Sequence, residues 1–149
     1  QMVNVFRDER CALLGVQKVV PADTAQYGII KPGRRRGKLH EVAGIVEKPK
    51  PSAAPSTLAV VGRYILMPRI FHHLQRMRPG AGGEIQLTDG IAALLKDEQV
   101  LGYQFDGVRY DCGSKLGYLK ANVAYGLKHP EVAREFAAYL AGLQRARRR

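Results

Sequence analysis

Short apolar runs along this chain alternate with segments in which apolar residues recur every three or four positions. The runs are rich in β-branched residues, which favours strands, whereas the longer periodicity favours helices that bury one face. Strands are expected at 11–20, 58–66, 100–105 and 108–112, and helices at 2–10, 68–79, 87–95, 115–128 and 131–145. This mixture of strands and helices predicts an α/β or α+β fold and argues against a helical bundle or a β-sandwich.

A hairpin is expected where two strand-like segments flank a stretch rich in glycine and arginine. The segments are 27–30 and 39–46, and the stretch Gly33–Gly37 between them predicts a loose tip. Asp23 is a candidate cap for a single helical turn ahead of the hairpin. The glycine-rich residues 80–83 predict a flexible turn between two helices.

The composition is that of an ordinary globular protein. The 149 residues suffice for one domain or a part of one, and the hydrophobic fraction of 46% is enough for a packed core. Two cysteines and four histidines show no disulfide framework and no metal-ligand spacing. No apolar run approaches the roughly 18 residues of a membrane span, and the first residues do not resemble a signal peptide. We therefore expect a reduced, cytoplasmic protein with no membrane partner.

The net charge of +11 invites a nucleic-acid-binding interpretation, but the basic residues are concentrated in two places. Five of them lie at 31–38, around the expected hairpin tip, and four lie at 145–149. Removing these nine from the 24 basic residues leaves 15, against 13 acidic residues. Because the excess lies on a turn and a tail rather than along a groove-lining element, we expect no nucleic-acid partner.

The run Val46-Glu47-Lys48-Pro49 places a carboxylate beside an ammonium group at the end of an expected strand. Side chains alternate along a strand, so Glu47 and Lys48 point to opposite faces unless the backbone bends. With a bend, the carboxylate can accept hydrogen bonds from hydroxyl groups while the ammonium group meets a phosphate. A sugar phosphate offers both partners, whereas the alternative for so common a dipeptide is a solvated strand end.

Asp111 lies between the strand expected at 108–112 and a helix for which Ser114 is a candidate N-cap. In α/β folds, ligands bind at the carboxyl ends of strands, and a carboxylate is a suitable ligand for magnesium. Equally, Asp111 can cap the helix together with Ser114. The residues alone leave the two interpretations open.

Other motifs of catalysis are missing from these 149 residues. The stretch Gly33–Leu39 differs from a phosphate-binding P-loop, because three residues separate its glycines and a leucine stands where the metal-binding hydroxyl belongs. There is no G-x-G-x-x-G sequence, and no serine lies in the context of a nucleophile elbow.

Several blocks, taken in order, point to one family. They are Tyr27-Gly28, Val46–Lys50, Ala53–Ser56, Leu58–Tyr64, Gly80–Asp89 and Tyr110–Tyr118. Their residues and spacing closely resemble the bacterial UTP–glucose-1-phosphate uridylyltransferases, a branch of the sugar nucleotidyltransferases. The resemblance runs from about Gln1 to Pro130 and leaves only the last residues outside it.

The resemblance implies the C-terminal part of a Rossmann-like α/β nucleotidyltransferase fold, with a mixed sheet flanked by helices. Residues 1–130 would form the sugar-phosphate-binding half of the domain, and residues 131–149 a C-terminal helix with a basic tail. The family's phosphate-cradling G-x-G-T-R-x-x-P loop and its first metal-binding aspartate do not occur in these residues. We therefore expect the chain by itself to be inactive.

The resemblance also implies a reaction of carbohydrate metabolism and a role for each site residue. An oxygen of glucose 1-phosphate attacks the α-phosphorus of UTP, pyrophosphate leaves, and UDP-glucose forms with Mg²⁺ as cofactor. Glu47 would bind glucose hydroxyls, and Lys48 would neutralise the sugar's phosphate. Gly28 and Gly62 would let the backbone approach the sugar, Val60 would offer it backbone contacts, and Asp111 would be one of two Mg²⁺ carboxylates.

Two alternatives remain open at this point. One is a related enzyme that uses another nucleotide, such as a glucose-1-phosphate thymidylyltransferase, because the residues that read the base would lie outside this chain. The other is a non-catalytic half-domain that serves as an interaction module. The apolar faces of the last two expected helices fit a subunit interface, so the full-length enzyme is expected to be a homo-oligomer.

Overall fold

A computed structural model describes residues 1–79 and 83–146 of the chain. The chain divides into two compact units, Gln1–Asp106 and Gly107–Arg149, and each is described by itself. The first unit contains α1 (Met2–Glu9), β1 (Ala12–Lys18), η1 (Pro21–Gln26), β2 (Gly28–Arg36), β3 (Leu39–Glu47), η2 (Pro51–Ala53), β4 (Leu58–Ile65), α2 (Arg69–Arg76), α3 (Leu87–Leu94) and β5 (Val100–Gln104). The second unit contains α4 (Lys115–Gly126) and α5 (Ala133–Ala146). The glycine-rich turn expected at 80–83 lies mostly outside the described residues.

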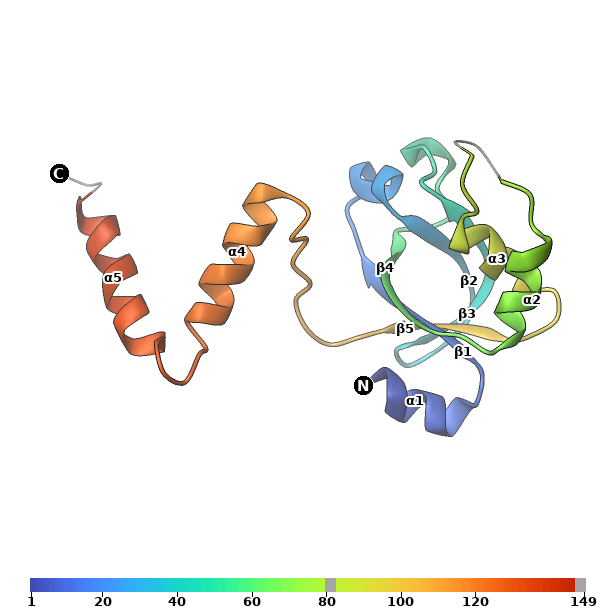
Figure 1. Cartoon of the computed structure of the whole chain (residues 1–149), viewed down its shortest axis with the longest axis horizontal. Helices are drawn as coiled ribbons and strands as arrows, with labels where there is room; N and C mark the ends of the chain where they lie inside the picture. The colour runs from blue at the N-terminus through green and yellow to red at the C-terminus, as the bar shows by residue number, and fades with distance from the viewer. Residues whose placement is uncertain (80–82, 147–149) are drawn as a thin grey trace. The chain divides into compact units, whose positions relative to one another are not determined.

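The strands of the first unit form one mixed sheet (Figure 1). β1 runs parallel to β5 and antiparallel to β4, while β3 runs antiparallel to both β5 and β2. β2 and β4 meet at a single register pair, Ile29 with Ala59. This mixed sheet with flanking helices confirms the predicted fold class, and it brings the start of β2 close to the start of β4.

The alternation of side chains along β1 explains how the sheet is covered on both faces. Leu14 and Val16 are fully buried in the main core, to which Ile91 and Leu94 of α3 also belong. Leu13, the neighbour of Leu14, points the other way into a smaller cluster with residues of α1. One strand therefore supports two layers. On the core side, α3 packs against β3, and α2 packs against α3.

Three sequence-based expectations about local structure are wrong. Residues 108–112 form no strand among the described residues, and all five are at least partly exposed. The hairpin tip is tight rather than loose, because β2 continues through Arg36 and only Gly37 and Lys38 form the turn. Asp23 caps no helix; its carboxylate accepts a hydrogen bond from the Gln26 amide.

Three of the five basic side chains around the hairpin tip are paired with carboxylates. Arg34 forms an ion pair with Glu41 at 3.0 Å, and Arg36 pairs with Glu9 of α1. Lys38 pairs with Asp106, where the first unit ends. The local charge of the tip is therefore partly balanced, as expected of a solvated surface.

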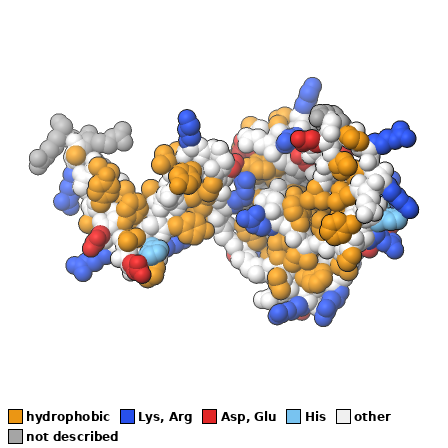
Figure 2. Space-filling view, viewed as in Figure 1, with side chains coloured by type: hydrophobic (Ala, Val, Ile, Leu, Met, Phe, Trp, Pro, Cys, Tyr) orange, Lys and Arg blue, Asp and Glu red, His pale blue; other side chains and the backbone are white. Residues whose placement is uncertain are grey.

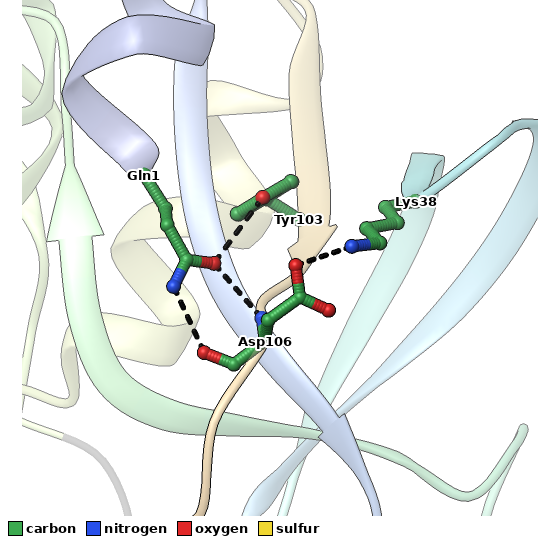
Figure 3. A network of polar contacts seen from close by, with 4 residues as sticks. All are labelled: Gln1, Lys38, Tyr103 and Asp106. Carbon is green, nitrogen blue, oxygen red and sulfur yellow. Dashed lines mark hydrogen bonds and ion pairs between the residues drawn. The ribbon is translucent and has the colours of Figure 1, made fainter.

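Asp106 contacts both Gln1 and Lys38 (Figure 3). Its backbone N–H donates to the Gln1 side-chain oxygen at 2.8 Å, and its carbonyl accepts from the Gln1 side-chain nitrogen at 2.9 Å. Tyr103 donates its hydroxyl to the same Gln1 oxygen at 3.4 Å. These contacts fix the chain end of β5 to the start of α1.

The second unit is a pair of helices. Ser114 caps α4, as predicted, because its hydroxyl accepts the Gly117 N–H at 3.0 Å. Hydrophobic side chains are exposed along both helices (Figure 2). In residues 1–79 and 83–146, no helix combines the length and the apolar character that a membrane crossing requires.

The two cysteines are predicted to differ in reactivity. Burial, with a smaller contribution from the charge of Glu9, raises the pKa of the Cys11 thiol, whereas Cys112 is exposed. Because the thiolate is the reactive form, iodoacetamide at pH 8 should label Cys112 at least about tenfold faster than Cys11. Mass spectrometry of the labelled peptides measures both rates, and Cys112→Ser should leave only the slow reaction. Equal rates would contradict the burial of Cys11.

Candidate active site

The backbone bends at the junction of Glu47 and Lys48. Glu47 is the last residue of β3. Lys48 has a φ of +44°, in the left-handed region that residues other than glycine rarely adopt. The Lys48 N–H donates to the Tyr27 carbonyl at 3.0 Å, which holds the bend against the start of β2. The bend that the sequence required for a joint role of the two side chains is therefore present. Such strained residues concentrate at functional sites.

The Glu47 carboxylate is held by contacts to both of its oxygens. The Thr88 hydroxyl, in the first turn of α3, donates to Oε2. Oε1 lies 3.9 Å from the Lys48 ammonium nitrogen. The Glu47 side chain is 28% exposed and that of Lys48 is 63% exposed. A fixed carboxylate thus lies beside a cation that solvent or a ligand can reach.

Gly28 lies directly beside the Glu47 carboxylate. It lies opposite Glu47 in the register of β2 and β3. A Cβ atom at this position would lie 3.2 Å from Glu47 Oε2 and 3.4 Å from the Thr88 hydroxyl oxygen. A Cβ atom here would crowd both groups, and they would have to shift by a few tenths of an ångström to make room for it.

Tyr64 of β4 is electrostatically linked to the same carboxylate. Burial raises the pKa of the Tyr64 phenol, and the negative charge of Glu47 raises it further. Both effects disfavour the phenolate, because burial and a nearby anion each oppose a second negative charge. Tyr64, which is 38% exposed as a residue, therefore keeps a neutral hydroxyl that is electrostatically coupled to Glu47.

Val60 and Gly62 lie on the adjacent strand, β4. Val60 as a whole residue is only 6% exposed, and it belongs to the main core. Its neighbour Ala59 is the residue that pairs with Ile29, next to Gly28. Gly62 has a φ of +70° and no atom within 4 Å of a Cβ position, so the backbone conformation rather than lack of space requires glycine.

Asp111 belongs to the second unit and lies in a turn rather than at a strand end. Its Oδ1 accepts the Gly113 N–H at 3.0 Å, and its carbonyl accepts the hydrogen bonds of the Ser114 N–H and hydroxyl. Asp111 therefore shapes the turn that leads into α4, while Ser114 provides the cap. The side chain is exposed.

The donors in the described residues do not complete a metal site by themselves. Within residues 1–79 and 83–146, no three side chains of histidine, cysteine, aspartate or glutamate are grouped so that they could hold an ion. Magnesium is commonly bound by one or two carboxylates together with substrate phosphates. Asp111 alone offers one such carboxylate.

Sequence reasoning missed the contact between Thr88 and Glu47. The two residues are 41 positions apart, and no periodicity links a helix start to a distant strand end. The only sequence signal was that Thr88 belongs to the Gly80–Asp89 block. The geometry brings Gly28, Glu47, Lys48 and Thr88 together from two strands and a helix.

Comparisons with known proteins identify the family of the chain. The model of the nucleotidyl transferase family matches residues 1–127. The chain belongs to this family. It is 44% identical over 140 residues to the UTP–glucose-1-phosphate uridylyltransferase of Staphylococcus epidermidis, covering 94% of this chain and 49% of that protein. The enzyme of the same name from Staphylococcus haemolyticus is 46% identical with the same coverage.

Solved structures give the same result. The UTP-bound enzyme from Acinetobacter baumannii superposes with a TM-score of 0.82 at 40% identity, covering 94% of this chain and 48% of that one. A glucose-1-phosphate thymidylyltransferase from Bacillus anthracis, a more distant neighbour, has a TM-score of 0.65 at 25% identity. The chain spans about half the length of the curated relatives it matches. The likeness therefore favours the uridylyltransferase branch over the thymidylyltransferase branch.

Proposed function

We propose that this chain supplies the sugar-phosphate site of an enzyme that forms UDP-glucose and pyrophosphate from UTP and glucose 1-phosphate. The observation that carries the proposal is the bend at Lys48, which sets an exposed ammonium group beside a fixed carboxylate. One molecule with hydroxyl groups and a phosphate satisfies both. The similarity to the uridylyltransferases supports glucose 1-phosphate as that molecule.

In the proposed reaction, an oxygen of the glucose 1-phosphate phosphate forms a bond to the α-phosphorus of UTP. The bond from that phosphorus to the oxygen bridging to the β-phosphorus breaks, and pyrophosphate leaves with its electron pair. Because the nucleophile is already an anion, no general base is needed. Catalysis then consists of positioning and charge neutralisation.

Each candidate residue has a place in this scheme. Glu47 accepts hydrogen bonds from glucose hydroxyls, and Lys48 neutralises the phosphate of the sugar. Gly28 and Gly62 allow a close approach of the sugar, and the backbone of Val60 contacts it. These assignments follow the family resemblance, and the clustering of Gly28 with Glu47 and Lys48 supports them.

Magnesium and assembly are further parts of the proposal. Asp111 is proposed as one of two Mg²⁺ carboxylates, and the ion when bound would offset the charge of the phosphates. The exposed hydrophobic side chains of α4 and α5 support a homo-oligomeric enzyme. We further propose a cytoplasmic location and no nucleic-acid partner, which the ion pairs of the hairpin tip support.

Binding of glucose 1-phosphate to the chain tests the proposed site. The wild-type chain should bind glucose 1-phosphate more tightly than glucose or inorganic phosphate, measured by isothermal titration calorimetry. Glu47→Gln should weaken that binding by about tenfold, because a neutral amide accepts hydroxyl hydrogen bonds more weakly than a carboxylate. A matched control is Glu84→Gln, at an exposed carboxylate, which should leave the affinity unchanged. Equal affinities for Glu47→Gln and the wild type would contradict the role of Glu47.

A further inference from the structure

We propose that Thr88 is a positioning residue that orients Glu47 and selects which carboxylate oxygen receives the sugar. This inference rests on the proposed function, because it concerns the same sugar site. Its basis is the hydrogen bond from the Thr88 hydroxyl to Glu47 Oε2.

Thr88 is well suited to hold another side chain in place. It is 9% exposed and lies in the first turn of α3. The helix is anchored by Ile91 and Leu94, which are fully buried in the main core, and it packs against β3. The hydroxyl is thus presented by a rigid element, and threonine itself has few side-chain conformations.

The contacts divide the two oxygens of Glu47 between different tasks. Oε2 receives the Thr88 hydroxyl and faces Gly28, where even a Cβ atom would come within 3.2 Å. Oε1 lies on the side of the Lys48 ammonium group, at 3.9 Å. A ligand that meets the exposed Lys48 through its phosphate would therefore meet Glu47 through Oε1. Thr88 fixes this choice, because it occupies the other oxygen.

Without the hydroxyl, Glu47 would keep its charge but lose its fixed orientation. Oε2 would be left in a confined site without its donor, and the carboxylate would rotate towards water or towards Lys48. The binding of the sugar would then include the cost of ordering this side chain again. The phosphate of the ligand would still meet Lys48.

The test compares variants of the full chain at position 88. Thr88→Val removes the hydroxyl at nearly constant shape and should weaken glucose 1-phosphate binding by roughly tenfold, while binding of inorganic phosphate changes by less than about twofold. Thr88→Ser keeps the donor and should restore most of the affinity. Thr24→Val is the matched control, because Thr24 is also buried and donates to the Pro21 carbonyl rather than to the site.

A double-mutant cycle separates positioning from general damage. If Thr88 acts through Glu47, Thr88→Val should have almost no further effect on glucose 1-phosphate affinity in the Glu47→Gln background. A general structural defect would instead lower the glucose 1-phosphate affinity by the same factor in the wild-type and the Glu47→Gln backgrounds. Thermal unfolding confirms that each variant is folded, and Thr88→Ala replaces the valine variant if the latter is not.

The side chain of Glu47 can also be observed without ligand. NMR couplings of its methylene protons should indicate one rotamer in the wild type and averaged rotamers in Thr88→Val. If the wild type binds glucose 1-phosphate but Thr88→Val has the same affinity, the role of Thr88 alone is overturned. Unchanged couplings in Thr88→Val would overturn it as well. Failure of the wild-type chain to bind glucose 1-phosphate would overturn the proposed sugar site, and this role with it.

Discussion

Replacing Asp111 by asparagine is expected to lower the rate of UDP-glucose formation by roughly two to four orders of magnitude and to raise the Mg²⁺ concentration required. The physical reason is that asparagine keeps an oxygen for the Gly113 N–H and so preserves the turn, but it removes the negative charge. The assay requires a complete enzyme, made by joining this chain to the half of the Staphylococcus epidermidis relative that it does not match. Pyrophosphate release is then followed across a Mg²⁺ titration.

Ser114→Ala provides the control for a purely structural role of Asp111. It removes the hydroxyl that caps α4 at Gly117 but changes no charge. Loss of such a cap costs about 1 kcal/mol of stability, and it should affect turnover little. If Asp111→Asn leaves the rate and the magnesium dependence unchanged, Asp111 only shapes the turn, and the metal assignment is wrong.

The parts of the fold that the sequence predicted are those in which local periodicity and burial agree. The apolar run that begins at Cys11 became β1, and the stripe that includes Ile91 and Leu94 became the buried face of α3. Ser114 was identifiable as a cap because capping is a local interaction. In each case, the residues that decide the structure lie within a few positions of one another.

The failures concern interactions between distant parts of the chain. The run 108–112 has strand-like composition, but a strand also needs a neighbour with which to pair, and composition does not specify one. The tight turn at Gly37 depends on the register between β2 and β3, which extends β2 into the arginine-rich stretch. Tertiary pairing decided both outcomes.

The candidate site was predictable in its residue types but not in its geometry. The sequence identified Glu47 and Lys48 and the need for a bend between them. A residue before proline ordinarily adopts an extended backbone, so the left-handed conformation of Lys48 ahead of Pro49 was not a local expectation. The contact with Thr88 joins residues 41 positions apart and became visible only in the folded unit.

Replacing Lys48 by alanine is expected to raise the KM for glucose 1-phosphate by roughly ten- to a hundredfold and to lower kcat by about tenfold in the completed enzyme. The ammonium group would attract the phosphate in the ground state and also offset the charge that builds up during transfer. Both kinetic constants should therefore change, whereas the KM for UTP should change by less than about threefold. Steady-state rates measured with each substrate varied in turn separate these effects.

Two further variants show whether the charge of Lys48 or its backbone conformation is responsible. Lys50→Ala removes an exposed positive charge two residues away and should leave both constants nearly unchanged. Lys48→Gly also lacks the ammonium group, but glycine adopts a φ of +44° without strain. If charge is decisive, Lys48→Gly should be as impaired as Lys48→Ala. Recovery of activity in Lys48→Gly would instead show that the left-handed bend, and not the ammonium group, is what this position contributes.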